Sequence, residues 1–156
     1  MSIAVATTKL IVEHLQSIVP DAECRRSYMP VVEPSALDEI GKTTLCVTPV
    51  EREADVYTQG GIQKNSFDID ICICAKLNHI NDEYEALLAE IDALMGFAEK
   101  IHSLFLKRIV INKDGLKASF DHPEHIVFFD RDVFQHCNSF LSIVRIKSII
   151  LVKPEV

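Results

Sequence analysis

The sequence contains little glycine and none of the short motifs that mark common enzyme sites. Five of its 156 residues are glycine, which is too few for elaborate phosphate-binding loops. The patterns G-x-S-x-G, G-x-x-x-x-G-K-[ST] and G-x-G-x-x-G do not occur. We therefore predict no catalytic site and no cofactor, and we expect a protein that is not an enzyme.

Long apolar runs and basic charge are also scarce. No run approaches the roughly 18 apolar residues that cross a membrane, and the start MSIAVATTKL has neither the basic flank nor the cleavage site of a signal peptide. With 16 lysines and arginines against 23 aspartates and glutamates, the formal net charge is −7. We therefore expect no membrane partner and no surface that grips nucleic-acid phosphates.

The cysteines do not suggest a disulfide framework. Their number, five, is odd, and no C-x-x-C pattern occurs. This usage indicates free thiols in a reducing compartment. The five are Cys24, Cys46, Cys72, Cys74 and Cys137.

Composition and hydrophobic periodicity predict one soluble α+β domain over residues 1–156. Apolar residues make up 48% of the chain and charged residues 25%, as in ordinary globular proteins. A helical period marks residues 3–19 and 81–106, and the alternation of a strand marks 66–76. Further expected elements are a helical turn at 35–38, strands at 43–50 and 140–152, a hairpin at 107–120, a strand at HPEHIVFF, and a break in the pattern at 130–132.

These elements predict a mostly antiparallel β-sheet with two helices packed on one face. Helices on both faces would need more helix than the sequence offers. The polar stretch 51–65, which contains Gly60-Gly61, predicts a long hairpin loop or a flexible arm.

The strand at 66–76 carries the most unusual side chains of the chain. Asp68, Asp70, Cys72 and Cys74 alternate with apolar residues, so all four share the face opposite to the core. If the strand pairs with 43–50, Cys46 joins the two thiols, but no fourth metal ligand follows in the sequence. Zinc sites favour ligands on turns with two to four residues between them. We therefore predict packed thiols and no metal.

The sequence His122-Pro-Glu-His125 is a second candidate for metal binding. It lies in a predicted turn before a strand, so it lacks the helical geometry of the H-E-x-x-H motif. His14 and His102 lie near apolar helix faces and are interpreted as hydrogen-bonded residues at the rim of the core. None of these histidines predicts a site.

Several short patterns together resemble the small tail-completion proteins of tailed bacteriophages, which include the tail terminators. The opening pattern Y-x-P … L … V-x-V-x-P of that family is matched by Tyr28-Met-Pro30, Leu37, Ile40 and Thr44-Leu-Cys-Val47-Thr-Pro49. A polar arm, an alternating strand and a long amphipathic helix follow in the same order. The end resembles the F-x-S-x-I-x-L terminal strand, here from Phe140, so the likeness covers most of residues 20–150.

The resemblance implies a structural virion protein of the tail or neck, present in the host cytoplasm during assembly. It implies a ring, hexameric in the terminators, that caps the tail tube, stops its polymerisation and provides the surface for head joining. Its partners would be further copies of itself, the tube protein and a head-closure or neck protein, with DNA passing through unbound. Candidate contact residues for a neighbouring subunit or the tube are Arg52, Glu53, Tyr57, Gly60, Gly61 and Arg145.

The acidic face formed by Asp68 and Asp70 has two possible places in such a ring. It can line the bore, where acidic groups let DNA slide because they do not hold phosphates. It can instead meet a basic residue of a neighbour, with Arg52 and Arg145 as candidates. Two other functions stay open: a neck or head-closure protein at a different ring level, and a small cytosolic α+β enzyme or regulator with a thiol site.

Overall fold

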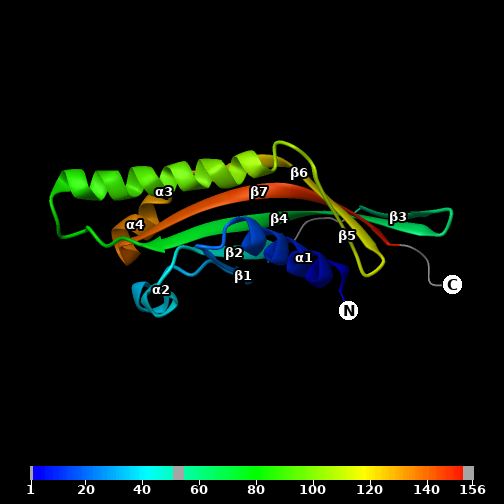
Figure 1. Cartoon of the computed structure of the whole chain (residues 1–156), viewed down its shortest axis with the longest axis horizontal. Helices are drawn as coiled ribbons and strands as arrows, with labels where there is room; N and C mark the ends of the chain where they lie inside the picture. The colour runs from blue at the N-terminus through cyan, green and yellow to red at the C-terminus, as the bar shows by residue number, and fades with distance from the viewer. Residues whose placement is uncertain (1, 51–54, 153–156) are drawn as a thin grey trace.

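A computed structural model describes residues 2–50 and 55–152 of the chain and confirms the α+β class (Figure 1). The helices in this part are α1 (Ile3–Ile18), α2 (Pro34–Ile40), α3 (Tyr84–Leu104) and α4 (Arg131–Cys137). The strands are β1 (Glu23–Arg26), β2 (Thr44–Pro49), β3 (Asp55–Gln59), β4 (Ile62–Lys76), β5 (Ile109–Lys113), β6 (Leu116–Val127) and β7 (Ser139–Val152). The long helices, the central strands and the hairpin at 107–120 thus lie close to their predicted ranges.

The strands form one mixed sheet in the order β1-β2-β4-β7-β6-β5, and β3 pairs with the start of β4. The predicted mostly antiparallel sheet is therefore corrected, because β1 runs parallel to β2. The cause lies in the connection: α2 stands between the two strands and returns the chain to the same direction, as a crossover does. The long strands β4 and β7 run antiparallel along the middle of the sheet.

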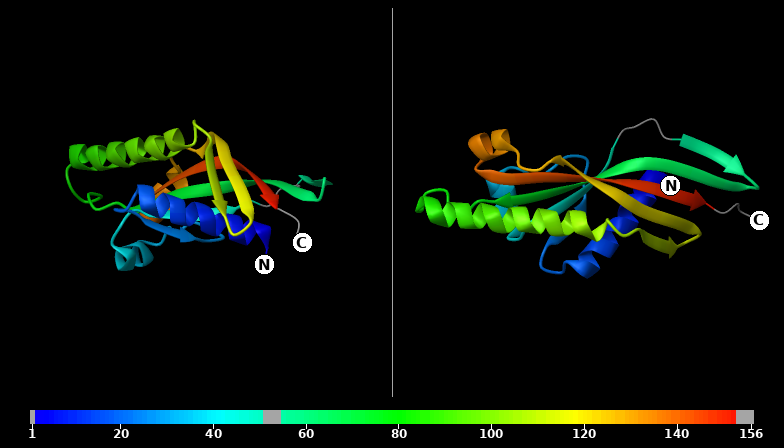
Figure 2. Two further views of the ribbon diagram at one scale, coloured as in Figure 1. Left: turned by 45° about the vertical axis from the view of Figure 1, so that its right-hand side comes forward. Right: turned by 90° about the horizontal axis from the view of Figure 1, so that it is seen from above.

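Helices cover both faces of the sheet, which corrects the prediction of two helices on one face. The long helices α1 and α3 share a core with the face of β4 that carries Ile69, Ile71 and Ile73. The two seven-residue helices α2 and α4 lie on the other face at one end, where Leu37 and Val133 pack with Cys72. Figure 2 shows this arrangement from two further sides.

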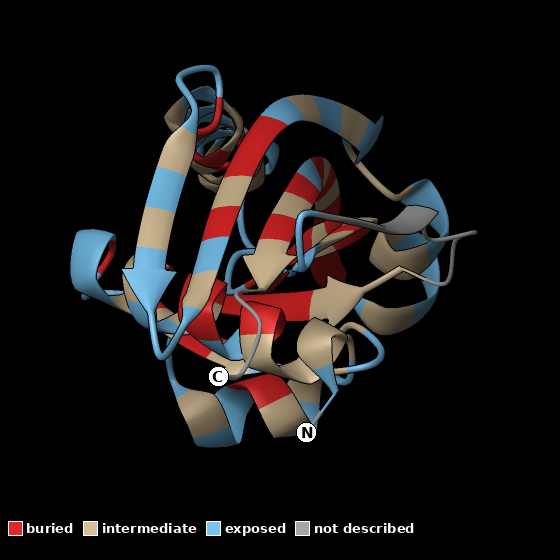
Figure 3. Cartoon of the chain, turned by 90° about the vertical axis from the view of Figure 1, so that its right-hand side faces the viewer, coloured by how far each residue is buried: buried red, intermediate tan, exposed pale blue. Residues whose placement is uncertain are grey.

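The main core follows from the predicted periodicities. In α1, Leu10, Ile11 and Leu15 point to the sheet and are buried, and in α3 Ala98 and Ile101 do so. Buried segments concentrate on the strands, while the outer surfaces of the helices are exposed (Figure 3). Burial of this apolar face is what fixes the register of β4 against its neighbours.

From residue 55 onward, the predicted arm forms a β-hairpin that belongs to the sheet. Residues 55–59 and 62–66 pair as strands β3 and β4, and Gly60 and Gly61 form the turn with φ angles of 60° and 80°. Only glycine adopts such angles without strain. In Figures 1 and 2 this hairpin extends beyond the helices at one end of the molecule.

The prediction of a strand at HPEHIVFF is confirmed over residues 122–127, but its separation from the preceding hairpin and the break expected at 130–132 were wrong. The strand expected at HPEHIVFF is a continuation of β6, interrupted by register shifts between Asp121 and Glu124 and again after His125. His122 lies in this interruption and has a φ of 52°. Because the bulge interrupts the alternation of a strand, the sequence suggests two separate elements where there is one. The expected break at 130–132 instead begins α4, whose first turn is capped by Asp130.

Candidate functional site

The candidate site is the polar part of the sheet face that α2 and α4 leave uncovered. Strand register places Asp70 between Thr48 of β2 and Arg145 of β7, and Asp68 beside Lys147. On the other side of β7, the same Arg145 stands opposite Glu124 of β6. Charges of both signs therefore alternate across neighbouring strands on this face.

Asp70 and Arg145 form a two-pronged ion pair within one chain. Arg145 donates from Nε to Asp70 Oδ1 at 2.7 Å and from its terminal nitrogen to Oδ2 at 3.0 Å. The two side chains are only 15% and 29% exposed. The hydrogen bond to Asp70 is the largest cause that raises the pKa of Arg145, and the fields of Asp70, Asp68 and Glu124 add to it.

This geometry changes the interpretation of the acidic face. Asp68 is only 4% exposed, and Asp70 is neutralised by an arginine of its own chain. In the single chain, these two aspartates therefore do not form a solvated acidic face. Arg145, proposed as a contact for a neighbour, already has a partner inside the subunit.

A second ion-pair cluster forms around the carboxylate of Asp121 on β6. Arg108 Nε donates to Asp121 Oδ2 at 3.0 Å, and His122 Nδ1 lies 2.8 Å from Oδ1. Burial raises the pKa of Asp121, but the hydrogen bonds from His122 and Arg108 outweigh this effect and lower the pKa overall. His122 is thus held by a carboxylate beside it.

The other histidine of that sequence, His125, stacks on His102 of α3. The two ring centroids are 4.4 Å apart, with planes inclined by 8°, and Phe128 packs edge-on against His125 at 4.6 Å. Burial first, and the neighbouring His102 second, lower the pKa of His125, while Glu99 raises it. The stack of His102 on His125 joins α3 to β6. His122 lies instead beside Asp121, so the two imidazoles of His122-Pro-Glu-His125 do not converge on one site.

The thiols on this face cluster as the sequence suggested, but they are buried. Cys46 stands opposite Cys72 in the register of β2 and β4, and Cys74 is next along β4. Their exposed fractions are 0%, 3% and 0%. Among the described residues, no group of three or more histidines, cysteines, aspartates or glutamates has the geometry to hold a metal ion.

The environment of these thiols shifts their pKa values in different directions. A hydrogen bond from the Cys74 thiol is the main cause that lowers the pKa of Cys46 to about 7, against its burial. Burial raises the pKa of Cys72 to about 12, and the pKa of Cys74 is raised first by its bond to Cys46. A nucleophilic thiol also needs contact with its substrate, and the packing under α2 and α4 does not give Cys46 that contact.

Three of the remaining predicted contact residues belong to the hairpin. Gly60 and Gly61 form its turn, and Tyr57 belongs to β3. Arg52 and Glu53 lie outside the described residues. The structure therefore brings Gly60, Gly61 and the backbone of Tyr57 together at one end, and it places Asp68, Asp70 and Arg145 further along the sheet face.

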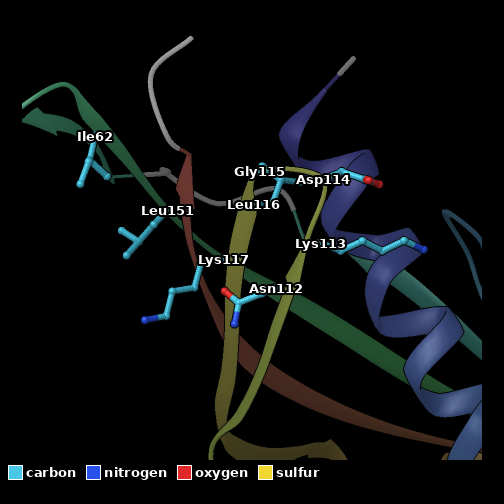
Figure 4. A pocket seen from close by; sticks show the side chains of 8 residues that line it. All are labelled: Ile62, Asn112, Lys113, Asp114, Gly115, Leu116, Lys117 and Leu151. Atoms are coloured by element: carbon cyan, nitrogen blue, oxygen red, sulfur yellow. The ribbon is translucent and has the colours of Figure 1, made fainter. Parts of the chain in front are cut away.

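An open depression of about 590 Å³ lies beside the hairpin, where β5 turns into β6. Its lining, shown in Figure 4, consists of Ile62, Asn112, Lys113, Asp114, Gly115, Leu116, Lys117 and Leu151. The side chains of Lys113 and Lys117 point away from one another in this view, and no group of convergent polar atoms marks a substrate position. The depression is better explained by the separation of the strand ends than by catalysis.

Comparison of the sequence with models of known protein families gave no match, and comparison with curated proteins gave none either. Among the described residues, none of the helices is both long and apolar enough to cross a membrane.

Proposed function

We propose that this chain is a structural virion protein of tailed bacteriophages, a tail terminator that forms a ring on the end of the tail tube. In this role it stops tube polymerisation and presents the surface to which the head joins. The observation that carries the proposal is the hairpin β3–β4, which prolongs the sheet beyond the helices as an arm (Figure 1). An arm of this kind suits contacts between subunits because strand edges satisfy their hydrogen bonds on a neighbour.

The net charge supports the same proposal. A ring through which DNA passes works best with a surface that repels phosphates, and the chain carries a net charge of −7. Because Asp70 is paired with Arg145 inside the subunit, the acidic groups that line the proposed bore need not include Asp70. A variant with lysine at both 68 and 70 would place positive charge beside Arg145 and destabilise the fold. A loss of assembly in this variant could therefore not be separated from a loss of stability.

The proposal assigns no chemistry to the thiols. Cys46, Cys72 and Cys74 pack with Leu37 and Leu141 in an apolar cluster, as small core residues do. A thiol enzyme is therefore the weaker interpretation. A neck or head-closure protein stays an alternative of the same class, since it shares the ring architecture but acts at another level.

Deletion of the gene in its phage tests the proposal. A protein that stops tube growth leaves tubes of uncontrolled length without joined heads when it is absent. A head-closure protein leaves tails of normal length and filled heads that leak DNA or stay unjoined. Normal tail length, normal head joining and normal infectivity of the deletion strain would together contradict the proposed function.

A further inference from the structure

Two strand edges lie at the same level on opposite sides of the sheet. Successive register partners lead straight from β3 to β5: Asp55 to Ser66, Ser66 to Ile149, Ile149 to Ser119, and Ser119 to Val110. The strands β3, β4, β7, β6 and β5 are therefore side by side here. Within the described chain, no strand pairs with the outer edge of β3 or of β5. Both edge strands are five residues long.

The two edge strands also have the same sense across the sheet, although the twist of the sheet turns them relative to each other. Each of the four steps from β3 to β5 is antiparallel, so the reversals cancel. Copies related by rotation about an axis along the strands keep that direction, and β3 of one copy would meet β5 of the next in parallel. Copies related by a two-fold axis would instead pair β5 with β5 in antiparallel fashion.

Apart from its short length and the lysine at its end, the edge of β5 has little protection against pairing. Natural edge strands carry proline, inward charges or bulges that prevent association, but Ile109, Val110 and Ile111 form an unbroken β-branched run. Val110 is 46% exposed. The charges at the two ends of this run are already paired within the chain: Arg108 Nε lies 3.0 Å from Asp121, and Lys113 Nζ lies 2.8 Å from Glu13 of α1. The sequence of β3, DVYTQ, likewise contains no proline and no lysine.

We infer that β3 of one copy adds in parallel to the edge of β5 of the next copy, so that the sheets continue from subunit to subunit. The partner is a second copy of this chain, and the contact is heterologous, which generates a ring when the rotation closes. Parallel addition conceals both edges at once, whereas a two-fold contact through β5 leaves β3 open. This inference rests on the proposed ring function and names the surfaces that build the ring.

Cysteine cross-linking tests the inference. Val110→Cys is combined in turn with a cysteine at each of positions 55–59, in a Cys137→Ser background, since the four other native cysteines are buried. The experiment uses the full chain at its highest soluble concentration, with its mass measured by sedimentation. We expect a ladder of cross-linked multimers beyond the dimer for at least one pair, and no cross-link for Val110→Cys alone.

Each other result overturns the inference in a distinguishable way. Cross-linked dimers of Val110→Cys alone would establish a two-fold β5 contact. Rings in sedimentation without any cross-link between β3 and β5 would place the interface elsewhere, and the proposed ring function would stand. A wild-type chain that stays monomeric at every concentration and also fails to bind tube ends would contradict both.

A second variant separates assembly from folding. Val110→Lys places a charge on the exposed edge and is expected to lose the assembled species while keeping the wild-type unfolding midpoint. Ile18→Lys is the matched control, since Ile18 is 37% exposed but lies at the end of α1. Retained assembly of Val110→Lys would overturn the inference.

Discussion

At the scale of single residues, the Asp70–Arg145 pair is the most consequential polar contact on the sheet face. Asp70→Asn leaves Arg145 partly buried without its counter-charge, and we expect the free energy of unfolding to fall by roughly 1–3 kcal/mol. Asp38→Asn is the control, because the Lys76–Asp38 pair is more exposed, at 35% and 59%. Its loss should cost less than about 1 kcal/mol. Equal effects in urea unfolding would contradict the account of the inner pair.

The thiols give a second test at this scale. Although the pKa of Cys46 is lowered to about 7 by the bond from Cys74, burial withholds it from reagents. We expect rapid labelling of Cys137 alone in the native protein at mildly alkaline pH, and labelling of all five cysteines after unfolding. Cys137→Ser should remove the native reaction. Rapid labelling of Cys46 in the native protein, mapped by mass spectrometry, would instead support the alternative of an enzyme with a thiol site.

The histidine stack predicts a pH dependence of stability. Because the pKa of His125 is lowered in the folded protein, the unfolded chain binds a proton more readily below about pH 6.5. The contribution of neutral His125 is therefore complete above this pH and is lost as the pH falls through it. His14 acts in the same direction, since burial lowers its pKa too.

The comparison of His125→Gln with wild type isolates this contribution. Urea unfolding at about pH 7.5 and about pH 5.5 should give a smaller loss of stability on acidification in the variant than in wild type. His136→Gln, at an exposed position of α4, is the control and should keep the wild-type difference. An unchanged pH dependence in His125→Gln would show that the stack is not the source.

At the scale of elements, α4 depends on its cap. Asp130 Oδ1 accepts a hydrogen bond from the backbone nitrogen of Val133 at 3.0 Å, and Asn138 ends the helix in the left-handed region with a φ of 53°. A helix of seven residues has little stability of its own. We expect Asp130→Ala to lower the free energy of unfolding by about 1 kcal/mol, and Asp130→Ser to restore most of it. Equal losses in both would argue that the cap is not the cause.

The same helix shows why sequence reasoning succeeded for some elements and failed for others. The ranges 3–19 and 81–106 were predicted because several turns of one face are apolar, and 66–76 because its alternation is regular. The seven residues of α4 are too few to show such a period, and Asp130 was interpreted as a break when it is a cap. The bulge at His122 divided β6 into two apparent elements for the same reason, since it interrupts the alternation.

The candidate site was predictable only in part. The alternation placed Asp68, Asp70, Cys72 and Cys74 on one face, and the pairing of 43–50 with 66–76 brought Cys46 to them, as observed. The burial of Asp68 and the pairing of Asp70 with Arg145 were not predicted, because they depend on the register between β4 and β7. That register joins residues 75 positions apart, and a lone strand pattern does not specify it. The parallel β1–β2 pair and the helices on the second face depend on packing in the same way.

At the scale of the whole molecule, three features support the proposed ring. The hairpin β3–β4 carries the sheet beyond the helices, the two outer edges at that end have the same sense across the sheet, and the net charge is negative. In the proposed ring, closure would pair these edges, and the negative charge would let DNA pass. The ring at a tube end is therefore the central claim.

Electron microscopy of tail tubes tests this claim most directly. Tubes polymerised from the tail-tube protein of the same genome are imaged with and without the purified chain, and their ends are averaged. The account predicts a ring of this protein at one end of each tube and no further growth from that end when more tube protein is added. Tubes that bind no chain at either end and grow to the same length in its presence would contradict the account.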